Sequence, residues 1–292
     1  MLLDLIDFVL NIAGLLLWLN WRTIRLDPIN RLTPATLAGT VRRAEPMRLQ
    51  RWHFLVALGA LLFVRAVFYG QIGPAVNWTP KLNLTVLSLA FPLTHGGHVF
   101  YRSALLFSLL SFLLALLIFY LWLLGLAVIN RRITNPDPFQ KLLLLQLGRP
   151  ARWPLIVQIA LPFVAGTALW MLCHPLLVHI GVISPVRSKS VLLAQGLILS
   201  LNAYLSLKFL LVGILLIHVI TSYIYLGNNP VWDFVNTTSR NILSLNWVPL
   251  RIGKFDFAPL LAIALIVLVF YWPLPGKINY LLDKHNLTLW PH

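Results

Sequence analysis

Asp7 and Arg65 are the two charged residues whose positions in this sequence most suggest chemistry. Arg65 stands in the middle of an apolar run, where a charge at bilayer depth costs about 2.5 to 3.5 kcal/mol and marks an ion pair, a cavity or a function. Asp7 is the candidate partner, because it lies fourteen residues from Trp21 and Arg65 lies thirteen residues from Trp52 on the next apolar run. The spacing predicts an intramembrane ion pair that fixes helix register, with ion or proton movement as the alternative.

Two further ionisable residues, Lys208 and His218, fall in one apolar run. Lys208 is nearer the predicted outer end of this run, so we expect its long stem to carry the ammonium group to the membrane interface. For His218 we expect a neutral imidazole bonded to a neighbouring helix, with a haem or metal ligand as the alternative. A channel or transporter component would require Arg65, Lys208 and His218 to line one aqueous path.

Four histidines could ligate haem iron or a transition metal if their two segments converged. The last two are five residues apart, which does not place them on one helical face, and no carboxylate stands near to orient either ring. We therefore predict no bound metal and no cofactor, and keep a haem- or metal-handling protein as an alternative. These histidines are His95, His98, His174 and His179.

The sequence offers few groups for catalysis. Glu occurs once and Asp seven times, and we find no nucleophile elbow, phosphate-binding glycine loop, metalloprotease motif or paired carboxylates. Asp4 and Asp7 are too close to Arg65 for an intramembrane protease. Cys173 is the single cysteine, so there is neither an internal disulfide nor a zinc motif. We expect no enzyme activity.

Composition places the chain in a membrane. Hydrophobic residues make up 59% of its 292 residues, and the mean hydropathy is +0.82, which is more apolar surface than a soluble domain can bury. The net charge of +15 comes from basic residues in short loops between apolar runs, the arrangement of topology determinants rather than of a nucleic-acid interface. We expect no nucleic-acid partner. The predicted spans are residues 3–21, 53–76, 104–129, 153–182, 199–226 and 256–275.

Three of the loops between spans resemble one another. Each begins with Asp or Asn followed by Pro, a pair suited to the N-cap and first turn of a helix: Asp27, Asp137 and Asn229 precede the prolines. These loops hold seven, five and three basic residues, fifteen against six on the other side. The positive-inside rule therefore predicts that the three loops are cytoplasmic and that both termini lie outside.

The third loop predicts an amphipathic surface helix. Asn229 can cap it, Pro230 suits its first position, and apolar residues recur every three to four positions. Asn236, Ser239 and Arg240 are predicted to face away from the apolar side. Beyond this helix, Asp256 is expected to cap the next span.

The order Asn-Pro, amphipathic segment, Pro-Leu-Arg, Gly-x-x-Asp-x-x-Pro and apolar run over residues 199–276 resembles the YggT family of small bacterial and plastid membrane proteins. The first repeat keeps Arg42 and Arg43 but lacks the Gly-x-x-Asp-x-x-Pro pattern, and the second is shortened. The resemblance implies a structural or docking role for these positions of the third repeat: Pro230, Pro249, Arg251, Gly253, Asp256 and Pro259.

We therefore predict an all-α polytopic membrane protein of about six transmembrane helices, arranged as three tandem helical hairpins with interfacial amphipathic helices in the cytoplasmic loops. The predicted parts are a first hairpin (1–76), an outer connection (77–103), a second hairpin (104–182), a third (183–276) and an interfacial tail (277–292). The resemblance implies a scaffold or assembly factor of the bacterial inner membrane, associated with cell division, osmotic response or cytochrome assembly. Its expected partners are anionic lipid headgroups and other membrane proteins.

Overall fold

The computed structural model of the chain describes residues 2–23, 51–76, 78–85, 87–91, 98–131, 133, 137–186, 188–224, 227, 229–243, 251–252 and 255–284. The chain divides into two compact units. Unit 1 comprises Met1–Pro80 and Phe91–Leu116, and unit 2 comprises Lys81–Ala90 and Leu117–His292. Helix α3 (His98–Ile129) contributes to both, because the division falls within it.

Six segments in the described part of the chain are helical, long and apolar enough to cross a membrane. Many of their large apolar side chains are exposed, as expected where acyl chains rather than protein surround a helix. The structure thus agrees with a helical membrane-spanning protein. The six segments are Leu3–Arg22, Trp52–Gly73, Ser103–Ile129, Leu155–His179, Lys189–Tyr223 and Ala258–Tyr280.

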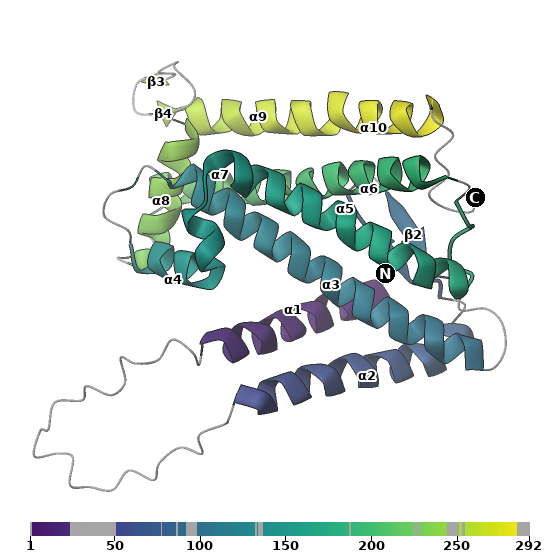
Figure 1. Cartoon of the computed structure of the whole chain (residues 1–292). Helices are drawn as coiled ribbons and strands as arrows, with labels where there is room; N and C mark the ends of the chain where they lie inside the picture. Colours follow the sequence, from purple (N-terminus) through teal and green to yellow (C-terminus); the bar gives the residue numbers. More distant parts are fainter. Residues whose placement is uncertain are drawn as a thin grey trace, which may run out of the picture. The chain divides into compact units, whose positions relative to one another are not determined.

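Unit 1 consists of α1 (Leu2–Thr23), α2 (Arg51–Ala75) and the first part of α3. Helices α1 and α2 lie side by side (Figure 1). Gly14 allows a close approach, since a Cβ there would lie 2.9 Å from the ring of Phe112 on α3. An aromatic cluster closes one end of the unit: the ring of Phe107 lies 5.9 Å from Tyr69 and 6.0 Å from Trp78.

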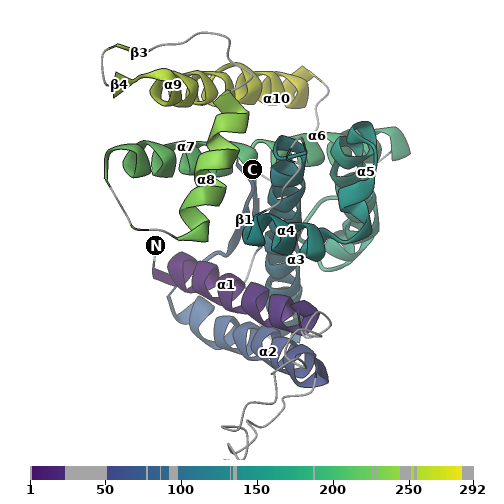
Figure 2. The same cartoon turned by 90° about the vertical axis from the view of Figure 1, so that its left-hand side faces the viewer.

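Unit 2 is built from the second part of α3 and seven further helices of the described chain. Helix α5 packs along α6, α7 packs on α8 and α9, and α4 packs on α8, which runs across the direction of α9 (Figures 1 and 2). Their bounds are α4 (Pro138–Leu147), α5 (Leu155–His179), α6 (Lys189–Tyr204), α7 (Leu207–Tyr223), α8 (Pro230–Leu243), α9 (Ala258–Tyr271) and α10 (Pro273–Lys284), with the 3-10 helix η4 (Arg149–Arg152) before α5.

Two short antiparallel pairs interrupt the helical pattern. Strands β1 (Lys81–Asn83) and β2 (Ser88–Ala90) form the first pair, in which Leu82 and Leu89 are opposite each other and buried. Alternating apolar and polar residues give this segment the period of a strand rather than of a helix. The second pair, β3 (Arg251–Ile252) and β4 (Phe255–Asp256), precedes α9.

The long apolar run after residue 189 is broken into two helices. Helix α6 ends at Tyr204 and α7 begins at Leu207, so the expected span from residue 199 to 226 comprises the end of α6 and all of α7, within the candidate span Lys189–Tyr223. Helix α6 packs on α5, whereas α7 packs on α8 and α9. The two helices thus have different packing partners on either side of the break.

Helix α8 begins as predicted but is not the free surface helix that its sequence suggested. Asn229 Oδ1 accepts a hydrogen bond from the backbone N–H of Val231 at 3.0 Å, which confirms the N-cap. However, Thr238 and Ser239 are fully buried. Ser239 Oγ donates to the carbonyl of Ile214 on α7 at 3.4 Å. Ser239, which was predicted to face away from the apolar side, therefore lies on a packed side of α8, because α7 packs against it there.

Helix α9 begins one residue later than expected. Its N-cap position is occupied by Phe257 rather than by Asp256, whose backbone belongs to β4. Pro259 falls in the first turn, where its missing N–H costs little, as predicted.

Candidate functional site

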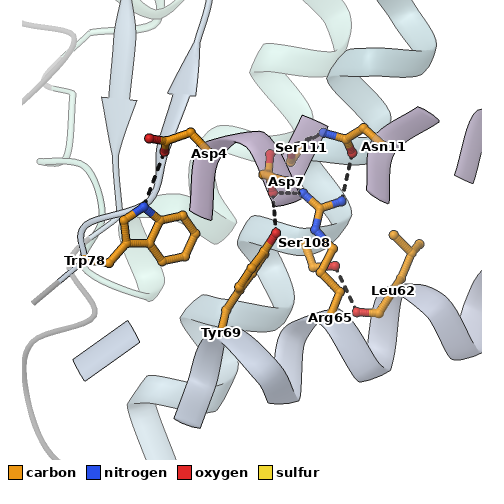
Figure 3. A network of polar contacts seen from close by, with 9 residues as sticks. All are labelled: Asp4, Asp7, Asn11, Leu62, Arg65, Tyr69, Trp78, Ser108 and Ser111. Carbon is orange, nitrogen blue, oxygen red and sulfur yellow. Dashed lines mark hydrogen bonds and ion pairs between the residues drawn. The ribbon is translucent and has the colours of Figure 1, made fainter. Parts of the chain in front are cut away.

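The most polar site in the described spans is the ion pair between Asp7 on α1 and Arg65 on α2 (Figure 3). The two side chains are 17% and 1% exposed. The pair lies among the apolar side chains of unit 1, where a charge without a partner is costly. The sequence placed these two residues at one depth, and the structure brings them into direct contact through Arg65 Nη2 and Asp7 Oδ1.

The Asp7 carboxylate accepts hydrogen bonds on both oxygens. Oδ1 accepts from the Tyr69 hydroxyl at 2.9 Å as well as from Arg65. Oδ2 accepts from Ser111 Oγ at 3.1 Å and from Asn11 Nδ2 at 3.3 Å (Figure 3). Each oxygen therefore has two donors, which hold the carboxylate in one orientation.

Arg65 is fixed by more than its carboxylate partner. Its Nη1 donates to Asn11 Oδ1 at 2.8 Å, and its guanidinium carbon lies 5.5 Å from the ring centre of Tyr69 and 5.9 Å from that of Phe107. Among the described residues, the buried Nε of Arg65 has no hydrogen-bond partner. The guanidinium is thus held between α1, its own helix and α3.

This site, which we call the unit 1 clamp (Asp7, Asn11, Arg65, Tyr69 and Ser111), draws on three helices. The two charged residues were predicted from the sequence, and the other three were not. Asn11 follows Asp7 by four residues and Tyr69 follows Arg65 by four, so helical spacing could have placed both on the same faces. Ser111 carries no comparable signal, because its approach depends on how α3 packs in unit 1.

Unit 2 contains a second polar cluster, centred on Asn130 at the end of α3. Asn130 Nδ2 donates to Thr238 Oγ1 at 2.9 Å, and Asn130 Oδ1 accepts from Asn241 Nδ2 at 2.9 Å. Gln140 Nε2 donates to the Asn130 carbonyl at 3.1 Å. One asparagine thereby connects α3 with α4 and α8, and its side-chain amide is used as both donor and acceptor.

His218 on α7 has the kind of partner that the sequence analysis expected. Its Nδ1 lies 2.8 Å from Asn236 Oδ1 on α8, and Thr221 Oγ1 donates to the same oxygen at 2.9 Å. The orientation of Asn236 toward α7 means that this residue does not face away from the packed side, which corrects the surface-helix prediction a second time.

Lys208 lies against two aromatic rings. The residue is buried, and its Nζ lies 3.9 Å from the ring centre of Tyr271 and 5.0 Å from that of Phe209. Its position relative to the membrane interface stays a prediction. A lysine covered by aromatic faces is stabilised by cation–π attraction in a desolvated setting. Lys208 thus joins α7 to α9 through Tyr271. This contact was not predicted from the sequence.

The histidine set is described only in part. His174 and His179 both lie on α5; His174 is buried beside Trp170, with ring centres 5.8 Å apart, and His179 is exposed. His95 lies outside the described residues, and of His98 only the backbone is described. Within the described part of the chain, no group of three or more His, Cys, Asp or Glu side chains is placed to hold a metal ion.

The YggT-like motif is likewise described in part. Pro230 opens α8 and Pro259 lies in the first turn of α9. Arg251 and Asp256 are backbone partners in the β3–β4 pair, and the structure does not describe their side chains. Four other residues of the sequence analysis lie outside the described residues: Arg42, Arg43, Pro249 and Gly253.

Both polar clusters have the chemistry of connections between helices. In the unit 1 clamp a carboxylate, an amide, a phenol and a hydroxyl bind one another, and in unit 2 one asparagine joins three helices. Such arrangements fix helix positions in a medium that offers no competing water.

Comparisons with protein-family models, with curated proteins and with solved structures gave no match to this chain.

Proposed function

We propose that this protein is a non-enzymatic integral membrane scaffold or assembly factor. The observation that supports this most is the saturation of Asp7: four donors, Arg65, Tyr69, Ser111 and Asn11, occupy its two oxygens. A carboxylate that relays protons or binds a passing ion must exchange partners. One that accepts four bonds from three helices instead holds those helices in register.

The outer surfaces of the spans support the same proposal. Large apolar side chains project from α1, α2, α5 and α9 without protein cover, among them Phe8, Phe63, Leu172 and Leu268. Surfaces of this kind contact acyl chains or the apolar faces of other membrane helices. The protein therefore offers extensive area for lateral association and few groups for bond making.

The YggT-like order of residues 199–276 gives the proposal its family context. In this proposal the spans form three tandem hairpins in a bacterial inner membrane, the three basic loops are cytoplasmic, and both termini lie outside. The fifteen-to-six distribution of basic residues supports that orientation. The partners are other membrane proteins of envelope, cell-division or membrane-complex assembly, together with anionic lipid headgroups.

Photo-crosslinking of the full chain in native membranes tests the scaffold role. A photoreactive phenylalanine analogue at Leu172, which is 71% exposed, is compared with one at Leu177 of the same helix, which is 1% exposed. We expect Leu172 to yield a crosslinked product of defined mass and Leu177 to yield none. Adducts to lipid alone from Leu172, and equally from Ile156 and Trp272, would contradict the proposal.

Reconstitution separates the scaffold from the two alternatives. A transporter predicts solute flux in liposomes that is lost on Arg65→Gln, and a haem- or metal-handling protein predicts a Soret band or stoichiometric metal in the purified protein. We expect neither. Either result, obtained with folded protein, would replace the scaffold proposal.

A further inference from the structure

Helix α4 (Pro138–Leu147) has its apolar and polar residues in an unusual arrangement. Phe139, Leu142 and Leu145 are 41%, 50% and 47% exposed, whereas Gln140 and Gln146 are buried. In a helix surrounded by water the amides would be outside and the leucines inside. The outward side of α4 is therefore suited to an apolar medium.

The buried side of α4 is held by specific contacts. These contacts prevent a rotation of the helix about its axis that would bury the exposed leucines. Gln140 Nε2 donates to the carbonyl of Asn130, and Leu143 and Leu147 pack in one cluster with apolar residues of α3, α7 and α8. Gly148, at a φ of 65°, ends the helix in a conformation that favours glycine. The outward apolar side is thus a property of the packed fold.

The neighbours of α4 in the chain place it at the surface of the membrane. The span before it ends at Ile129 and the span after it begins at Leu155, so α4 lies between the ends of two spans on the same side of the bilayer. A helix of ten residues there is too short to cross. Its exposed leucines are next to the boundary between headgroups and acyl chains.

The charges of this segment match a lipid headgroup layer. Residues 138–154 contain Lys141, Arg149 and Arg152 and no Asp or Glu, and all three basic residues are exposed. Trp153, also exposed, has the amphipathic ring that is common at membrane interfaces. Basic groups at that depth attract the phosphates of anionic lipids.

We propose that residues 138–154 form a membrane-interface anchor. Phe139, Leu142 and Leu145 insert at the acyl boundary, and Lys141, Arg149 and Arg152 bind the phosphates of anionic phospholipids. The sequence predicted interfacial helices in the cytoplasmic loops and gave most weight to α8, whereas α8 exposes no large apolar side chain between Val231 and Leu243. The inference rests on the membrane-spanning character of the chain and not on the scaffold role.

Depth-dependent quenching tests the insertion. In a Cys173→Ser background, a fluorophore is attached to Leu142→Cys, Leu145→Cys or, as the control, Asp233→Cys, which is exposed on α8. The full-length protein is placed in nanodiscs whose lipids are brominated near the carbonyl end of the acyl chains. We expect the bromines to reduce emission about twofold or more at Leu142 and Leu145 and little at Asp233. Two results would overturn the proposal. One is quenching of the two α4 sites by aqueous iodide, and the other is no quenching by either bromine or iodide because a protein covers these sites.

A second measurement tests the headgroup contact. Energy transfer to labelled phosphatidylglycerol is measured in mixed nanodiscs for three proteins. They are the protein with all its basic residues, the triple variant Lys141→Gln, Arg149→Gln, Arg152→Gln, and the matched control Arg240→Gln on α8. We expect the triple variant to reduce phosphatidylglycerol enrichment about twofold or more and the control to leave it unchanged. Equal enrichment in all three proteins would overturn the assignment of these residues. The quenching and energy-transfer experiments do not depend on a protein partner, so they can fail while the crosslinking experiment of the proposed function succeeds.

Discussion

Asp7 illustrates at the scale of a single residue why a charge can be kept inside a membrane segment. Transfer of a carboxylate from water into an apolar medium costs several kcal/mol, and this cost is offset only when the geometry of its partners is good and its lone pairs are occupied. Arg65 supplies the opposite charge, and Tyr69, Ser111 and Asn11 supply the remaining donors. The arrangement ties three helices through one side chain.

The first prediction is that Asp7 and Arg65 stabilise each other. Asp7→Asn or Arg65→Gln alone leaves the other charge uncompensated, so each should lower the free energy of unfolding by about 3 kcal/mol. The double variant should cost less than the sum of the two. The measurement is a double-mutant cycle from denaturant unfolding in detergent micelles.

Asp4→Asn is the control for this cycle. Asp4 also lies on α1, but it is exposed, and the hydrogen bond that it accepts from Trp78 Nε1 is long, at 3.3 Å (Figure 3). Its substitution should show little coupling to Arg65→Gln. Additive effects for Asp7 and Arg65 would mean that the ion pair does not contribute to stability.

At the scale of elements, the contact between α5 and α6 depends on small residues. A Cβ at Gly196 would lie 2.9 Å from Thr167 Cγ2 and 3.3 Å from the Thr167 carbonyl oxygen, so a glycine is required for the observed approach. Thr167 Oγ1 and Ser200 Oγ, 3.1 Å apart, add a hydrogen bond across the same contact. Without a hydrophobic driving force between helices in lipid, such close packing and polar contacts hold the pair together.

The second prediction follows from this close approach. Gly196→Ala should lower the free energy of unfolding by about 1 to 3 kcal/mol, since the new methyl group forces the two backbones apart. Gly213→Ala on α7 is the matched control, because a Cβ there meets nothing within 4 Å. The control should be neutral or stabilising through higher helix propensity. Equal thermal shifts for the two variants would show that the α5–α6 contact tolerates the extra volume.

At the scale of the whole molecule, the basic residues are distributed unevenly along the chain. Fifteen fall in the three repeated loops and six in the segments at the other ends of the spans, while Arg65 and Lys208 lie within spans. Basic residues are retained preferentially on the cytoplasmic side during insertion, whereas acidic residues have little effect. The distribution supports a cytoplasmic location for η4 and α8.

The third prediction concerns this orientation. In a Cys173→Ser background, Ser184→Cys in the connection between α5 and α6 should react with an impermeant maleimide in intact cells, whereas Arg240→Cys on α8 should react only after permeabilisation. Both positions are exposed. Asn236 is less suitable as a reporter, because it is partly buried and bound to His218. The reverse labelling pattern would place the three repeated loops outside the cell.

The number of membrane-spanning segments could be predicted from the sequence alone, because the thickness of the bilayer sets the length and the apolar character of each span. A span requires about twenty apolar residues, and six such runs are visible. The Asn229 cap and Pro230 act within one turn of helix, so their effect needs no distant partner. Asp7 and Arg65 could be paired because two antiparallel spans allow depth to be counted from either end.

The tertiary structure alone decided which polar residues meet and which helix surfaces remain free. Ser111 joins the unit 1 clamp, and Asn236 turns toward His218, through contacts that are far apart in the sequence. The same applies to the two candidate surface helices: α8 has the stronger amphipathic pattern yet is packed on several sides, while α4 exposes its leucines. Periodicity shows that a helix has two different sides, but the side that is covered depends on the neighbours that pack against it.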